Sequence, residues 1–134
     1  MQFKRTGATV IGALVIAAGS ALLTAAPAGA VGGCDPSKLC LYRSTEYRTM
    51  SFAASSTGAC FDLEGYGLVY PSNGINSYVN NLPVNATLYH SEPTGWFPMS
   101  TIRSGGFSSN TGALTPNGYW YRHSEKICTG SAHP

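Results

Sequence analysis

The sequence predicts an all-β protein, and three features of its 134 residues support this prediction. After residue 30, apolar residues do not recur at the three-and-four spacing of an amphipathic helix over any useful length. Short runs of β-favouring residues occur instead, and Gly, Pro, Asn and Ser separate most of them. The four cysteines all follow residue 30, and an even number of cysteines is typical of a small exported domain with two disulfides.

The first thirty residues have the order of a secretory signal peptide. Lys4 and Arg5 give a positive start, residues 8–23 are almost wholly apolar, and AAPAGA at 25–30 ends in small residues. Two alternatives remain: the apolar stretch is long enough for a membrane anchor, and VGGC at 31–34 loosely fits a lipid-attachment box. The small residues before Val31 favour cleavage, and lipidation of Cys34 would leave an odd number of cysteines. We therefore expect a signal peptide at 1–30 and a secreted, extracellular protein without a membrane attachment.

Removal of the signal peptide leaves 104 residues, which is the size of one small domain, 31–134, expected to be a monomer. Lys4 and Arg5 account for the net charge of +2, so six basic and six acidic residues make this domain neutral. Nucleic-acid binding requires a basic surface, so a nucleic-acid partner is not expected.

Eight short strands are expected in chain order, at 39–42, 50–53, 59–63, 67–70, 77–79, 86–90, 96–99 and 119–122. Turn-type sequences such as PSNG and TPNG lie between them. Strands of this length and spacing predict a Greek-key sandwich. CLYRSTEYRTMSF at 40–52 and TLYHSEPTGWFPM at 87–99 each have a Leu-Tyr pair, a polar turn and an aromatic-bearing strand. This faint repeat predicts two motifs of one plan.

The cysteines are Cys34, Cys40, Cys60 and Cys128, and four cysteines allow three pairings. The sequence does not choose among them. We favour Cys34 with Cys60 and Cys40 with Cys128, which would close the start of the domain onto its end.

The same residues resemble the βγ-crystallin motif, and the domain resembles the microbial secreted peptidase inhibitors of the metalloproteinase-inhibitor type that have this fold. The resemblance rests on Cys34, LCLY at 39–42, ACFDL at 59–63, YG at 66–67 and NGINSYVNN at 73–81. It covers residues 34–90 well. In the second half LTPNGYWYR at 114–122 stands where a second Asn-Asp…Ser-Ser run would be, so the second motif is expected to be degenerate.

The resemblance implies a role for the first hairpin, which would fold back over its sheet. Tyr47 would then pack on Tyr42, and Ser77 would hydrogen-bond the hairpin. Thr49 stands where the family has a glycine, so its backbone would be strained if its φ is positive.

The resemblance also raises the question of calcium, because crystallin-type domains often bind this ion through Asn or acidic and Ser residues. Asn73, Asn76 and Ser77 are weak candidates, since SNGINS at 72–77 contains no carboxylate. We expect no cofactor, with calcium as the remaining option.

The sequence contains no metalloprotease, nucleophile-elbow, phosphate-loop or redox motif, and we expect no enzyme. Asp62 and Glu64 share one strand face in this interpretation, as paired-carboxylate hydrolysis would need, but a solvated face explains them better.

Inhibition of an extracellular peptidase, by resemblance a metallopeptidase, requires only a rigid exposed loop. PTGWFPMS at 93–100 offers the candidates Trp96, Phe97 and Met99, although a core strand pair is the favoured interpretation of this stretch. Residues 103–112 are a second, mobile candidate. The alternative function is an extracellular βγ-crystallin-type module, calcium-stabilised or toxin-like, without inhibitory activity.

Overall fold

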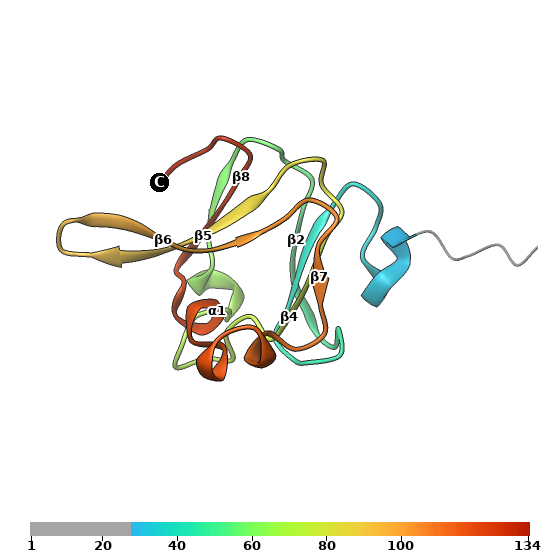
Figure 1. The fold of residues 1–134 in the computed structure, drawn as a ribbon, viewed down its shortest axis with the longest axis horizontal. Helices are drawn as coiled ribbons and strands as arrows, with labels where there is room; N and C mark the ends of the chain where they lie inside the picture. Colours follow the sequence, from blue (N-terminus) through green and yellow to red (C-terminus); the bar gives the residue numbers. More distant parts are fainter. Residues whose placement is uncertain (1–27) are drawn as a thin grey trace, which may run out of the picture.

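The computed structural model describes residues 28–134, and residues 1–27, with nearly all of the expected signal peptide, lie outside the described part. The described chain is mostly β-structure, as predicted (Figure 1). Its strands are β1 Leu39–Tyr42, β2 Met50–Ala54, β3 Cys60–Asp62, β4 Ser77–Asn80, β5 Ala86–Glu92, β6 Gly95–Ile102, β7 Phe107–Ser108 and β8 Lys126–Thr129. Its helical segments are short: the 3₁₀ turns η1 Ala28–Gly33, η2 Glu64–Tyr66, η3 Thr111–Ala113 and η4 Pro116–Gly118, and the helix α1 Tyr119–His123.

The strands form two antiparallel sheets with the orders β2-β1-β4-β7 and β3-β8-β5-β6. Listed from its other edge, the second sheet has the order β6-β5-β8-β3. Its strands β6, β5 and β8 correspond to β2, β1 and β4 of the first sheet, each four strands later in the chain. The last place is held by β7 in the first sheet and by β3 in the second. Each half of the chain therefore gives its third strand to the sheet of the other half. The two halves are interlocked and share one interior.

The register of the strands repeats between the halves. The β1–β2 ladder has a bulge between Leu41 and Tyr42, and the β5–β6 ladder has one between Leu88 and Tyr89. Bulges bend a strand and increase its twist at a defined point. The Leu-Tyr pairs noticed in the sequence therefore lie at equivalent positions of the two sheets.

The core lies between the two sheets and consists of aliphatic side chains from alternate strand positions, together with the buried aromatic rings of Phe52, Tyr78 and Tyr121. Leu41, Leu88 and Ile127 are completely buried there. Tyr78 of β4 stacks on Tyr121 of α1, with ring centroids 5.7 Å apart. Burial and the neighbouring Tyr121 phenol raise the pKa of Tyr78 well above its ordinary value, so its hydroxyl stays neutral in the core.

Two of the predicted strands are wrong. Residues 67–70 follow η2, which ends at Gly67 in a left-handed conformation with φ of 69°. Residues 119–122 belong to the helix α1, although their aromatic side chains favour strands. Asn117 and Gly118, both with positive φ, turn the chain just before it and direct Tyr121 into the core. Burial of Tyr121 in the core outweighs the preference of these aromatic residues for a strand.

The expected disulfide pairing is also wrong. The bridges are Cys34–Cys40 and Cys60–Cys128. Cys60 and Cys128 are register partners of the adjacent strands β3 and β8, with Cα atoms 4.0 Å apart. Cys34 lies just before β1, in a buried cluster with Cys40. One bridge is therefore local, and the other ties the two halves together through the exchanged strand β3.

Candidate functional site: two unlike hairpins and the cleft beside one of them

Residues 43–49, here called the folded hairpin, lie over the outer face of the first sheet. The rings of Tyr42 and Tyr47 meet edge to face, with centroids 5.8 Å apart and planes at 76°. The buried Ser77 hydroxyl donates to the carbonyl of Ser44 (2.6 Å) and accepts from the amide of Tyr47 (3.1 Å). Burial raises the pKa of both phenols. The contacts expected of Tyr42, Tyr47 and Ser77 are all present.

Three residues of the folded hairpin have left-handed backbones: Glu46 (φ 57°), Tyr47 (φ 54°) and Thr49 (φ 59°). This conformation is unusual for any residue other than glycine and is least favourable for a β-branched one. The strain expected at Thr49 is therefore present, and the bonds to Ser77 help to hold the hairpin in this shape.

The proposed calcium ligands are engaged in other contacts and do not fit a calcium site. The Asn76 amide nitrogen donates to the carbonyls of Arg43 and Asn73, both at 2.8 Å, and its oxygen faces an Arg122 guanidinium nitrogen at 3.5 Å. Ser77 Oγ already donates and accepts within the folded hairpin. A cation bound at these oxygens would meet the positive charge of Arg122 and displace bonds that hold the hairpin, so no function is derived from calcium here.

The second half lacks the fold-back, and strand register gives the reason. Ser77 is the β4 partner of Tyr42, and the β8 partner of Tyr89 is Lys126. The long Lys126 side chain extends across the outer face of its sheet, where its ammonium pairs with Asp62 and lies 5.1 Å from the Trp96 ring centroid. A lysine supplies no hydroxyl to bind a folded turn at this position.

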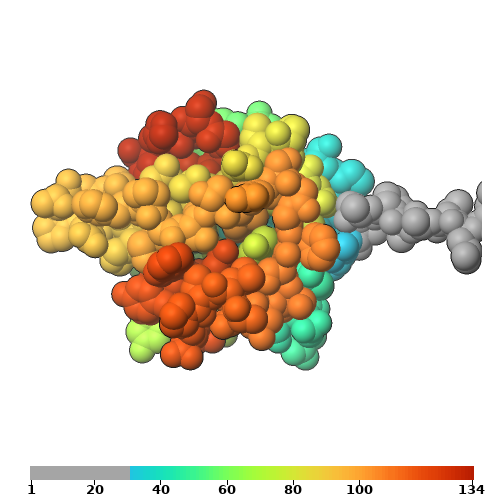
Figure 2. All heavy atoms as spheres, viewed as in Figure 1, coloured from blue at the N-terminus to red at the C-terminus, as the bar shows by residue number. Residues whose placement is uncertain are grey.

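The second hairpin, formed by β5 and β6 and here called the projecting hairpin, extends straight out of the molecule. Figure 1 shows it on one side of the ribbon, and Figure 2 shows it in yellow and orange as a finger beyond the body. Its ladder continues to the pair Glu92 and Gly95. The side chains of residues 91–98 are all exposed. The favoured interpretation of 93–100 as a core strand pair is therefore wrong for the outer part of this hairpin.

The three loop candidates divide into two groups. Trp96 is 37% and Phe97 42% exposed, and as neighbours in β6 they point to opposite faces of the hairpin. Met99 occupies the bulge of β6, is half-buried and packs against the core. Only Trp96 and Phe97 are available to a partner.

The other candidate segment, 103–112, is held against the first sheet. It contains β7, and the Asn80 amide donates to the Gly106 carbonyl at 2.8 Å while the Gly105 amide donates back to the Asn80 carbonyl at 2.8 Å. The Asn80 side chain is completely buried beside it. This segment is a structural part of the sandwich.

A cleft of about 410 Å³ lies between the body of the molecule and one side of the projecting hairpin, at the register pair Ser91 and Trp96, and we call it the root cleft. Asp62, Glu64 and Glu125 supply carboxylates, and Tyr70 and Trp96 supply aromatic rings. Ser91 contributes an amide that donates to Glu125 Oε2 at 2.7 Å. The sequence pointed to Asp62 and Glu64, but Glu125 and Trp96 join them only through the strand order β3-β8-β5-β6.

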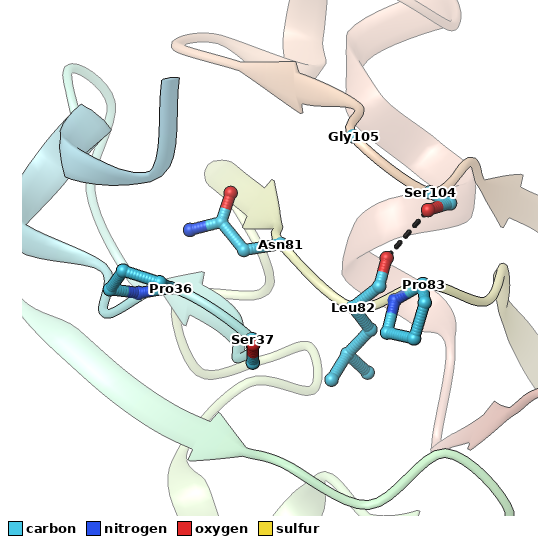
Figure 3. Close-up of a pocket in the computed structure, with 7 residues that line it drawn as sticks. All are labelled: Pro36, Ser37, Asn81, Leu82, Pro83, Ser104 and Gly105. Carbon is cyan, nitrogen blue, oxygen red and sulfur yellow. Dashed lines mark hydrogen bonds between the residues drawn. The ribbon is translucent and has the colours of Figure 1, made fainter. Parts of the chain in front are cut away.

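A second hollow, of about 480 Å³, lies between the loops at 36–37, 81–83 and 104–105. Figure 3 shows the Pro, Ser and Gly residues of its wall together with Asn81 and Leu82, and Ser104 Oγ donates to the Leu82 carbonyl at 2.6 Å. It carries no charged side chain.

Within residues 28–134, His, Cys, Asp and Glu side chains do not gather into groups of three that would hold a metal ion. In the same part of the chain, every helix is too short or too polar to cross a membrane. No protein-family model, curated protein or solved structure is significantly similar to the chain.

Proposed function

We propose that the chain is a secreted peptidase inhibitor with a βγ-crystallin-like Greek-key fold, whose projecting hairpin enters the cleft of an extracellular peptidase. The repeat of strand order with exchange of β3 and β7 supports the fold part of this proposal. The leader-like sequence of residues 1–30 and the two disulfides support export.

The observation that carries the proposal is the projecting hairpin itself. Its outer strand β6 has a neighbour on one side only, so its other edge is free to pair with an extended backbone in a peptidase cleft. Trp96 and Phe97 provide large apolar anchors on this strand. The ladder with β5 holds the strand extended before binding, which reduces the ordering cost.

Metallopeptidases of the thermolysin type are the proposed targets, because the resemblance names this class and because such enzymes favour large apolar side chains. Phe97 is the proposed central anchor, since Trp96 is partly covered by Lys126 whereas Phe97 lies on the other face.

The test is titration of the purified domain 31–134 against thermolysin-like and subtilisin-like peptidases. We expect stoichiometric inhibition of the first class, and Phe97→Ala should raise the inhibition constant at least about 30-fold, as loss of a central anchor does. Phe107→Ala is the matched control, because Phe107 is an exposed phenylalanine (59%) on β7 of the other sheet. Absence of inhibition, or an equal effect of the two variants, would contradict the proposal and favour a non-inhibitory extracellular module.

A further inference from the structure

We infer that Pro98 prevents the projecting hairpin from pairing with the same hairpin of a second copy of this chain. The free edge of β6 therefore stays open to a different partner. The inference concerns the edge that the proposed function uses, but it does not require that function, because only copies of this chain take part.

The hydrogen bonds of β5 show which of its backbone groups face β8. In an antiparallel strand, the N–H and C=O groups of one residue point to one side and those of the next residue to the other side. The Tyr89 carbonyl accepts from the Glu125 amide at 2.8 Å, and the Ser91 amide donates to the Glu125 carboxylate at 2.7 Å. The backbone groups of Tyr89 and Ser91 therefore point towards β8 and away from β6.

This direction fixes the backbone groups that β6 presents at its free edge. The register partners of Tyr89 and Ser91 in β6 are Pro98 and Trp96. Both pairs are non-hydrogen-bonded pairs of the β5–β6 ladder, so the backbone groups of Trp96 and Pro98 point away from β5. Trp96 offers an N–H and a C=O at this edge, whereas Pro98 offers a C=O alone.

The side chains of β6 would otherwise favour addition of another strand. The strand Gly95–Ile102 contains no charged residue, and its Trp, Phe, Thr and Ile residues favour β-structure. Its outer part, 95–98, is exposed. An exposed, uncharged edge strand is a template for a further strand, and proline at an outward-facing position is one of the features that block such pairing.

The effect of Pro98 is largest in the pairing that two copies would favour. With Phe97 opposite Phe97 of the second copy, the two phenyl rings are cross-strand neighbours, and Trp96 lies opposite Pro98 of the second copy as a hydrogen-bonded pair. Pro98 accepts from the Trp96 amide, but its ring stands where the donor to the Trp96 carbonyl would be. Half of the hydrogen bonds of these pairs are thus lost, and both Trp96 carbonyls are left without a donor.

A shifted register does not recover the lost bonds. With Trp96 opposite Trp96 of the second copy, Pro98 faces the turn residue Thr94, beyond the last ladder pair of the hairpin, Glu92 and Gly95. With Pro98 opposite Pro98, neither residue supplies a donor. Pro98 therefore weakens every pairing of the two hairpins that uses the exposed part of β6.

The first test is amide hydrogen exchange in the unsubstituted domain 31–134. We expect the Trp96 amide to exchange at the rate of an open peptide, because it faces solvent. The amide of Phe97 faces β5 in the ladder and should exchange at least about tenfold more slowly. Protection of the Trp96 amide that increases with protein concentration would show that the natural edge does pair with itself, and would overturn the inference.

The second test is analytical ultracentrifugation of Pro98→Ala, which adds the missing N–H to the edge. We expect its dimer dissociation constant to be at least about tenfold lower than that of the unsubstituted domain, with the Trp96 amide protected in the dimer. Pro98→Val supplies the same N–H if alanine disturbs the hairpin. Pro93→Ala is the matched control, because it removes a proline from the turn of the same hairpin and leaves the edge unchanged.

A charge at the proposed twofold axis tests the geometry of the dimer. Adding Phe97→Lys to Pro98→Ala should restore the monomer, because the pairing sets the two lysines opposite each other. Adding Phe107→Lys, on β7 of the other sheet, should leave the dimer intact. The inference is overturned if folded Pro98→Ala and Pro98→Val remain as monomeric as the unsubstituted domain, if Pro93→Ala dimerises equally, or if both lysines act alike. No peptidase is present, so failure here and failure of the inhibition assay are separate results.

Discussion

Ser77 and Lys126 occupy equivalent strand positions and lead to opposite outcomes for the hairpins above them. The short Ser77 hydroxyl binds both arms of the folded hairpin, whereas the long Lys126 side chain leaves its sheet face and pairs with Asp62. The hairpin beside the serine covers its sheet, and the hairpin beside the lysine projects from its sheet.

Thr49 is the residue at which local and global preferences conflict most clearly, since a β-branched residue has a φ of 59°. We expect Thr49→Gly to raise the free energy of unfolding by about 1 kcal/mol, because glycine adopts this conformation without steric cost. Chemical denaturation of the two proteins measures the difference.

Thr45→Gly is the control for this prediction. Thr45 lies in the same hairpin but is not among the residues with positive φ. Its replacement should therefore lower stability by about 0.4–1 kcal/mol through the greater freedom of the unfolded chain. Equal destabilisation by both glycines would show that Thr49 carries no strain.

The elements that were predictable from sequence are those whose pattern is local. The buried run LCLY and the segment around Ser77 became β1 and β4 because β-favouring residues are bounded there by turns. The helix α1 was not predictable, because its aromatic residues favour strands and the deciding contact, Tyr121 on Tyr78, is distant in the chain. β8 is short and lacks clear alternation, and only its pairing with β3 and β5 identifies it as a strand.

The disulfide pairing was likewise not predictable from local sequence, because it depends on which strands are adjacent. Cys60–Cys128 follows from the adjacency of β3 and β8, which no local pattern indicates. The root cleft has the same origin, because its carboxylates and rings come from segments joined only by this strand order.

The two bridges should differ in their contribution to stability. Cys60–Cys128 closes a loop with a sequence separation of 68, and Cys34–Cys40 one of 6. The chain-entropy relation gives about 4 kcal/mol for the long loop and about 2 kcal/mol for the short one. We therefore expect the pair of Ala substitutions at Cys60 and Cys128 to lower the denaturation midpoint about twice as far as the pair at Cys34 and Cys40. A larger effect of the local pair would refute this order.

At the scale of the whole molecule, exchange of the third strands makes each half incomplete. β3 has no partner within the first half, and β7 has none within the second. Because the core lies between sheets that both halves build, neither half can cover its own apolar face.

We accordingly expect fragments 31–84 and 85–134 to be unfolded when separate and to regain structure when mixed under oxidising conditions. Far-UV circular dichroism and the dispersion of amide proton signals measure this recovery against the intact domain as control. A dispersed spectrum from either fragment alone would mean that the halves fold independently and that the strand exchange is not required.

The projecting hairpin has one more consequence for the molecule. Its outer residues, 91–98, have exposed side chains, while the bulge that roots the hairpin is tied to the core by Met99. Sequence change at the tip is therefore separated from the stability of the rest, in the way that an antibody loop varies on a constant framework. The sequence of the tip can therefore change, by natural drift or in the laboratory, while the framework keeps its fold.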